Sequence, residues 1–186
     1  LKTFLREHGY DAKTHDANVE PRFREITDRY FSALRGFVPQ DKQTEGNYFL
    51  NIGQDVFRNH MMAHLNHRDE EEYIKLVDIL VYNTFFCHLD HPQIIELNSI
   101  LEDFYQRFEQ YFLDLLAEEK PTVLGLSVYS GTLPASMLAF KLAKKNYPHI
   151  KTVMGGGIFA DQLAVGSQDL EFFLEKAPYI DKLIVG

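Results

Sequence analysis

The chain of 186 residues has a single cysteine, Cys87, and no run of about 18 uncharged apolar residues. One cysteine excludes an internal disulfide and favours a reducing compartment, and the lack of a long apolar run argues against a membrane-spanning helix. Positive charge is scarce as well, because 19 Lys and Arg stand against 27 Asp and Glu and no basic stripe is present. We therefore expect a cytoplasmic protein that binds neither nucleic acid nor an anionic membrane.

Glycine-rich motifs that bind nucleotides are also lacking. No Gly-x-x-x-x-Gly-Lys-Ser/Thr phosphate-binding loop occurs anywhere in the chain. The segment 155–160, GGGIFA, follows a late strand and has no third glycine in the register of a dinucleotide-binding fingerprint. These absences argue against a free-standing nucleotide-binding protein.

Apolar and aromatic residues, by contrast, are abundant. Hydrophobic residues make up 45% of the chain, with 15 Phe and 10 Tyr, which is enough for the core of one domain that carries a large insertion. The sequence opens on Leu1 and stops at Gly186, directly after a strand-like run. This pattern is expected for a piece of a longer protein.

The two ends of the chain have the pattern of an α/β fold. Residues 1–19 predict the end of a helix, a stop at Gly9 and a short strand over residues 12–17, which together are half of a βαβ unit without its first strand. Residues 120–186 predict strand, helix, strand, helix, strand. The predicted elements are strands at 122–129, 150–154 and 180–186 and helices at 133–147 and 159–176. We expect a Rossmann-like (flavodoxin-like) parallel sheet with helices on both faces.

Residues 20–119, between these ends, have the pattern of helices only. The stretch is rich in Phe, Tyr, Leu and charged residues and lacks the β-branched runs of strands. We expect four helices, beginning near residues 21, 46, 69 and 92, with Asp69 as the N-cap of the third and Pro92 in the first turn of the fourth. Nearly a hundred helical residues exceed an ordinary crossover connection, so this stretch is predicted to be an inserted helical layer.

Three consecutive glycines, Gly155, Gly156 and Gly157, end one of the predicted strands. The hydroxyl-rich segment 127–132, SVYSGT, ends the strand before it, and both belong at the carboxyl edge of a parallel sheet, where ligands bind. Bare backbone beside hydroxyl groups suits a flat or phosphate-bearing ligand. A tight turn and helix capping explain the same residues without a ligand, and both interpretations stay open.

Three stretches of the chain, taken in order, carry a resemblance to a known family. They are LREHGYDAKTHDANVE (5–20), EKPTVLGLSVYSGTLPASMLAFKLAKKNYPHIKTVMGGG (119–157) and APYIDKLIVG (177–186). Together they resemble the cobalamin-binding domain at the N-terminus of many radical S-adenosylmethionine enzymes. The resemblance covers residues 1–20 and 120–186 and does not explain the helical stretch between them.

The resemblance implies a cobalamin-binding-like α/β core of residues 1–19 and 120–186, with its first strand missing, and a helical insertion of residues 20–119. It also implies that the nucleotide tail of cobalamin lies between the loop after the family's third strand and the glycines after the fourth. The implied cofactor-binding residues are Ser127, Val128, Tyr129, Ser130, Thr132, Gly155, Gly156, Gly157 and Gly186.

Two motifs of that family are absent from the chain. The motif Asp-x-His-x-x-Gly, which supplies a histidine to cobalt, does not occur, and His15 is a poor substitute because it follows the second strand of the family. The Cys-x-x-x-Cys-x-x-Cys motif needs three cysteines to hold an iron–sulfur cluster. The cluster and S-adenosylmethionine would therefore belong to a downstream radical barrel domain.

The expected function is that of a non-catalytic cobalamin-binding domain, which presents the corrinoid to this barrel. The alternative is a cofactor-free Rossmann-like domain of the same kind of enzyme, which packs on the barrel or recognises a peptide or small-molecule substrate. Binding of hydroxocobalamin with a base-off absorption spectrum would distinguish the two.

Two clusters of metal-binding residue types suggest a different kind of site. The clusters are His60, His64 and His67, and Cys87, His88 and His91. The three histidines of the first share one helix face and could bind zinc. Histidines near helix ends are also common as solvated residues or partners of the helix dipole, and we favour a structural role for both clusters.

Overall fold

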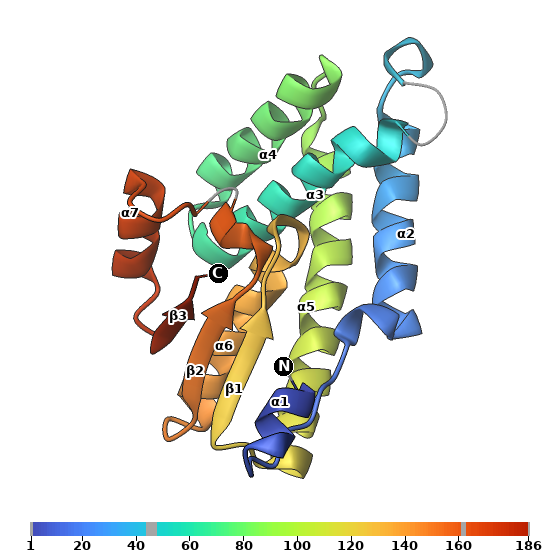
Figure 1. The fold of residues 1–186 in the computed structure, drawn as a ribbon. Helices are drawn as coiled ribbons and strands as arrows, with labels where there is room; N and C mark the ends of the chain where they lie inside the picture. Colours follow the sequence, from blue (N-terminus) through green and yellow to red (C-terminus); the bar gives the residue numbers. More distant parts are fainter. Residues whose placement is uncertain (1, 44–47, 161–162, 186) are drawn as a thin grey trace.

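The computed structural model describes residues 2–43, 48–160 and 163–185 (Figure 1). Within these ranges the chain is a mixed α/β fold, in which a parallel sheet of three strands joins a larger group of helices. The helices are α1 (Lys2–Glu7), α2 (Pro21–Phe37), α3 (Tyr48–Asn66), α4 (Glu70–Phe85), α5 (His91–Glu119), α6 (Leu133–Asn146) and α7 (Gln168–Lys176). The strands are β1 (Val123–Ser127), β2 (Lys151–Gly155) and β3 (Lys182–Ile184), and the short 3-10 helices are η1 (Ala17–Val19), η2 (Gln40–Lys42), η3 (Ser130–Thr132) and η4 (Gly157–Ala160).

The N-terminal segment contains the predicted helix but not the predicted strand. Gly9 follows α1 with a φ of 82°, as expected of a glycine that stops a helix. The prediction of a strand over residues 12–17 is wrong, because this segment leads directly into η1. Lys13 and His15 attach it to Glu119 at the end of α5. A strand needs a neighbouring strand for its backbone hydrogen bonds, and this segment is held to a helix end by side chains.

All four helices predicted for residues 20–119 are present as α2 to α5. Asp69 caps α4 by accepting a hydrogen bond at 2.8 Å from the backbone N–H of Glu72. Asp90 caps α5 in the same way, and Pro92 lies in the first turn of that helix. Asp69 and Pro92 therefore predicted these helix starts correctly, whereas the cap by Asp90 was not predicted. The start predicted near residue 46 lies outside the described residues.

The three strands of residues 120–186 run parallel in the order β1–β2–β3. Val123 pairs with Lys151 at the start of β1, and Gly155 pairs with both Ser127 and Ile184 at the carboxyl end of the sheet. The predicted strands are thus all present, although β1 and β3 are shorter than predicted and β2 is shifted by one residue.

The helix predicted over residues 159–176 is only half as long as expected. η4 ends at Ala160, and α7 begins after Ser167, whose hydroxyl accepts a hydrogen bond at 3.1 Å from the N–H of Leu170. Gly166 precedes this cap with a φ of 80°, a conformation that favours glycine and interrupts a helix. The apolar pattern of residues 159–176 therefore includes a non-helical segment around Gly166, which separates η4 from α7.

Only one face of the sheet is covered by helices in the described part of the chain. Met154 on the inner face is fully buried in a cluster with Phe140 of α6 and Leu170 of α7. On the other face Val123 and Ile184 are 57% and 60% exposed. Parallel crossovers are right-handed, so two crossovers between strands in sequential order place both helices on one face. The prediction of helices on both faces is therefore wrong for these elements.

Helix α6 joins the sheet to the helical layer (Figure 1). It packs on the sheet through Phe140, and its opposite side, with Ala139 and Leu142, packs on α3 and α5. These two residues belong to the main core cluster, which also contains the buried residues of α2 to α5. The helical layer therefore shares its core with the α/β part.

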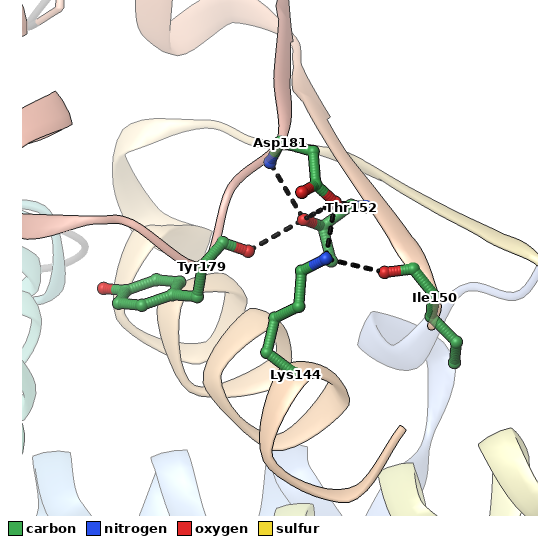
Figure 2. A network of polar contacts seen from close by, with 5 residues as sticks. All are labelled: Lys144, Ile150, Thr152, Tyr179 and Asp181. Atoms are coloured by element: carbon green, nitrogen blue, oxygen red, sulfur yellow. Dashed lines mark hydrogen bonds and ion pairs between the residues drawn. The ribbon is translucent and has the colours of Figure 1, made fainter. Parts of the chain in front are cut away.

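A polar network holds the start of β3 against β2 (Figure 2). The Asp181 carboxylate accepts hydrogen bonds from the Lys144 ammonium at 2.6 Å and from the Thr152 N–H at 2.8 Å. Lys144 also donates to the Ile150 carbonyl at 2.8 Å, and the buried Thr152 hydroxyl donates to the Tyr179 carbonyl at 2.7 Å. The Lys144 ammonium, followed by the Thr152 N–H, lowers the pKa of Asp181 to about 2.

The substitution Thr152→Val is expected to lower the free energy of unfolding by about 1–3 kcal/mol. Valine keeps the volume of this fully buried side chain but leaves the Tyr179 carbonyl without its hydroxyl donor. Urea unfolding at pH 7 measures the effect. Thr84→Val is the control, because the Thr84 hydroxyl donates within its own helix, to Leu80. Equal losses in the two variants would contradict this role of the network.

Candidate functional site

The loop after β1 and the three glycines at the end of β2, Gly155 to Gly157, meet at the carboxyl end of the sheet, as predicted. Ser127 and Gly155 are paired at the ends of their strands. Beyond them, the N–H of Val128 donates to the Gly155 carbonyl at 2.7 Å, and the N–H of Ile158 donates to the Val128 carbonyl at 3.1 Å. Val128 itself is fully buried. Backbone hydrogen bonds therefore fix the two loops to each other.

Gly156 is required by packing within the protein. Its φ is 112°, a conformation that other L-residues rarely adopt. A Cβ atom at this position would lie 2.5 Å from both the nitrogen and the oxygen of the Val128 backbone. The space beside Gly156 is thus filled by the neighbouring loop, and the tight-turn interpretation accounts for this glycine.

Gly157 lies against an aromatic ring instead. A Cβ atom here would lie 2.8 and 2.9 Å from two carbons of the Tyr129 ring. Tyr129 is 58% exposed, and an exposed side chain can change rotamer where a backbone cannot. Gly157 is therefore bare backbone covered by a flat group that can be displaced.

Hydroxyl groups of the loop after β1 have partners inside the protein. The Thr132 hydroxyl accepts a hydrogen bond from the Tyr129 N–H at 3.0 Å, and the Ser130 hydroxyl accepts one from the Arg58 guanidinium. Arg58 belongs to α3, has a side chain only 18% exposed and also contacts Asp55 at 3.0 Å. The helical layer therefore places a cation at the carboxyl end of the sheet.

Two other residues were considered for cofactor binding, and of these only His15 lies within the described residues. Gly186 lies outside the described residues. His15 contacts Glu119 at 3.3 Å, and Glu119 precedes β1, so His15 lies at the amino end of the sheet. The five residues of β1 separate it from the site by roughly 16 Å.

His60 has the environment of a structural histidine. It is fully buried in the helical layer, where its Nδ1 lies 2.9 Å from the Tyr30 hydroxyl and its Nε2 lies 2.6 Å from the Tyr73 hydroxyl. Both ring nitrogens are therefore engaged. Burial lowers the pKa of His60 to about 3, with a smaller contribution from the nearby His64.

The other candidate metal ligands are dispersed. Polar partners are Asn98 for His64 (2.9 Å), Asp78 for His88 (2.8 Å) and Glu70 for His91 (3.9 Å), whereas His67 is exposed and Cys87 is a half-buried thiol whose pKa is raised by burial. Among the residues that the structure describes, no three His, Cys, Asp or Glu side chains are grouped to hold a metal ion. The hypothesis of a zinc site therefore gains no support from their arrangement.

Arg58 is the member of this site that sequence reasoning missed. It lies 72 residues before Ser130 in the chain, and no local motif surrounds it. Only the packing of α3 beside η3 brings the two together. α3 also contains Asp55, which contacts Arg58, so the charge of Arg58 in the sequence did not indicate a partner outside its own helix.

No described helix is long and apolar enough to cross a membrane. Comparison of the chain with protein-family models, with curated proteins and with solved structures finds no match.

Proposed function

We propose that the carboxyl end of the sheet binds a flat cofactor and that this cofactor is cobalamin. One observation carries the proposal: the exposed ring of Tyr129 lies on the bare backbone of Gly157. Tyr129 belongs to the loop that follows Ser127 at the end of β1 and that also contains Ser130. A planar group already fits there, and a larger one could replace the tyrosine ring. The resemblance to cobalamin-binding domains of radical S-adenosylmethionine enzymes supports the identity of the cofactor.

Part of a cobalamin fits the residues at this edge. Gly157 would contact the benzimidazole of the nucleotide tail, Ser127 and Ser130 would hydrogen-bond its polar groups, and Arg58 would pair with its phosphate. Gly156 fits no ligand, because the backbone of the neighbouring loop fills its space. When bound, cobalamin supplies a cobalt centre for methyl transfer.

In this proposal the chain is a non-catalytic domain that binds and orients the corrinoid. Residues 1–19 and 120–186 form the Rossmann-like (flavodoxin-like) core, and residues 20–119 are the helical insertion, which adds Arg58 to the site. A radical barrel domain, which holds the iron–sulfur cluster and S-adenosylmethionine, is the partner, and the compartment is the cytoplasm.

Hydroxocobalamin tests this proposal. We expect the chain to retain the corrinoid through gel filtration with a base-off absorption spectrum, because Gly157 would hold the benzimidazole away from cobalt. His15 lies at the other end of the sheet and would not replace the base as a cobalt ligand. Gly157→Val should weaken binding by about tenfold or more, because the valine side chain would occupy the space of the benzimidazole ring. Tyr129→Ala should tighten binding about threefold, because no ring has to be displaced.

Gly36→Val is the matched control for these variants. A Cβ at Gly36 meets no atom within 4 Å, so this variant should bind hydroxocobalamin like the unaltered chain. If neither the unaltered chain nor Tyr129→Ala retains corrinoid, cobalamin is not the ligand.

A specific observation favours a second candidate function. The hydroxyls of Ser130 and Thr132 already have partners in the protein, as expected of a loop that needs no ligand. A cofactor-free domain that recognises a peptide or small-molecule substrate for the same kind of enzyme would account for them. Failure of the hydroxocobalamin test would leave this function.

A further inference from the structure

A pocket with a volume of about 370 Å³ lies at the amino end of the sheet. It is lined by the end of α5, by the connection from α5 to β1 (residues 120–122) and by the connection from α6 to β2 (residues 147–150). The five residues of β1 separate it from the candidate cobalamin site by roughly 16 Å. The pocket is therefore a separate site, which the proposed function does not use.

Hydrogen bonds hold the two connections in place. The N–H of Lys151 donates to the Thr122 carbonyl at 2.9 Å and so joins the connections, and the N–H of Ile150 donates to the Tyr147 carbonyl at 3.0 Å. The Lys144 ammonium also donates to the Ile150 carbonyl, at 2.8 Å. Because these walls are already ordered, they lose little conformational entropy when a ligand binds.

The lining of the pocket combines apolar side chains with hydrogen-bond donors. Leu116 and Ile150 are only 2% and 1% exposed and belong to the main core cluster. The polar side chains of the lining are the Lys120 ammonium, the Tyr147 hydroxyl and the His149 imidazole, and each can donate a hydrogen bond. Among the described residues, no Asp or Glu lines the pocket. An apolar surface beside donors suits an anion with a hydrocarbon body.

The acidic residues next to the pocket leave this preference in place. Glu119 precedes Lys120 in the chain, but its carboxylate is paired with Lys13 and His15. Glu118 is exposed and does not line the pocket. The carboxyl end of α5 carries partial negative charge, which the Lys120 ammonium offsets.

We propose that this pocket binds a small organic acid, namely a carboxylate with an aryl or alkyl body. The body packs on Leu116 and Ile150, and the carboxylate accepts hydrogen bonds from Lys120, Tyr147 and His149. A volume of about 370 Å³ is within the range of small-molecule sites. The proposal does not depend on cobalamin, so its test is independent of the hydroxocobalamin test.

Benzoate, 4-phenylbutyrate and 2-naphthoate serve as probes, each beside its uncharged amide. Isothermal titration calorimetry at pH 7 should detect binding of at least one of the acids. This acid should bind about fivefold more tightly than its amide, because the amide cannot form an ion pair with the Lys120 ammonium.

Lys120→Gln should weaken binding of the acid by about threefold or more and leave binding of the amide nearly unchanged. Lys145→Gln is the matched control, because it removes the same charge from an exposed residue of α6 that does not line the pocket. This control should bind the acid like the unaltered chain. Tyr147→Phe, which removes only the hydroxyl, should weaken binding of the acid by about threefold.

Ala117→Phe is the variant that blocks the pocket. Ala117 is an exposed residue of α5 that lines the pocket, so a phenyl ring should occupy part of the space and weaken binding of acid and amide by about tenfold or more. Gln106→Phe, at an exposed position of the same helix outside the pocket, is its control and should bind like the unaltered chain. Circular dichroism checks that both variants fold.

Any of five results would overturn the proposal. They are no binding of any of the three acids, equal binding of acid and amide, equal effects of Lys120→Gln and Lys145→Gln, unchanged binding in Ala117→Phe, and displacement of the acid by hydroxocobalamin. The last result would place the acid at the carboxyl end of the sheet. Retention of hydroxocobalamin does not depend on any of the other results, so this proposal and the proposed function can fail separately.

Discussion

The protein is expected to lose about 3 kcal/mol of its free energy of unfolding when the pH falls from 6.5 to 4, because His60 resists protonation in the folded state. His60 is fully buried, and burial lowers its pKa to about 3, against about 6.5 for a solvated histidine. Small domains have only about 5–15 kcal/mol of stability in total. Urea unfolding at half-unit pH steps measures the loss.

The hydrogen bonds around His60 determine which tautomer is buried. The Tyr73 hydroxyl donates to Asn98 Oδ1 at 2.6 Å, so its oxygen accepts from the Nε2–H of His60. Nδ1 then accepts from the Tyr30 hydroxyl at 2.9 Å. A second proton on Nδ1 would break the bond from Tyr30 and place a charge in the core, where His64 adds repulsion.

The direction of the effect follows from the two pKa values of His60. The unfolded chain binds this proton below about pH 6.5, but the folded chain binds it only near pH 3. The unfolded state therefore holds more protons between these limits, and stability falls as the pH falls. The Asp181 carboxylate affects stability only at lower pH. Its pKa is about 2 in the folded chain, so the stability that it contributes is lost only as the pH falls below the usual carboxyl pKa of 3.8.

His60→Gln separates His60 from the other titrating groups. Glutamine has a donor and an acceptor but does not titrate. The free energy of unfolding of this variant should therefore vary less between pH 6.5 and 4.5 than that of the unaltered chain, whatever its absolute value. The exposed His67 provides the control variant, His67→Gln, which should keep the full slope. A flat stability profile of the unaltered chain over this range would show that His60 is not held neutral.

Helices were the part of this fold that sequence reasoning could predict. Their signals are local: Asp69 caps α4 through Glu72, three positions ahead, and Pro92 preorganises the first turn of α5. Tertiary contacts are not needed to recognise such a signal. The starts of α2, α4 and α5 therefore followed from the sequence, and the fourth, predicted near residue 46, lies outside the described residues.

The strand pattern was less informative because a strand depends on its neighbours. Residues 12–17 have an extended pattern, yet Lys13 and His15 attach the segment to Glu119, and it has no place in the sheet of β1 to β3. The sheet of residues 120–186 could be predicted because β1 and β2 are each followed by a crossover helix. Which face those helices would leave open depended on the strand order, which no local pattern specifies.

The candidate site was predictable in its position but not in its contacts. Strand ends bearing Ser127 and Gly155 had to meet in a parallel sheet. That Val128 fills the space beside Gly156, and that Arg58 reaches Ser130, depends on distances between loops and helices. His60 shows the same limit, because its spacing suggested a metal ligand, whereas Tyr30 and Tyr73 occupy both of its nitrogens.

Gly156→Ala is expected to lower the free energy of unfolding by about 3 kcal/mol or more. Two costs add: alanine is strained at a φ of 112°, and its Cβ would lie 2.5 Å from the nitrogen and oxygen of Val128. The Val128 backbone cannot yield without losing its hydrogen bonds to Gly155 and Ile158. Chemical unfolding at pH 7 gives the loss directly.

Gly157→Ala is the matched comparison, because it adds the same methyl group to the next residue. Its Cβ would meet the Tyr129 ring at 2.8 Å, so the cost should be about 1 kcal/mol and should disappear in a Tyr129→Ala background, which a double-mutant cycle measures. The same background should not rescue Gly156→Ala, since its obstacle is backbone. If Gly156→Ala cost no more than Gly157→Ala, the close approach of Val128 would be too loose to require glycine, and the bare backbone at both positions would be open to a ligand.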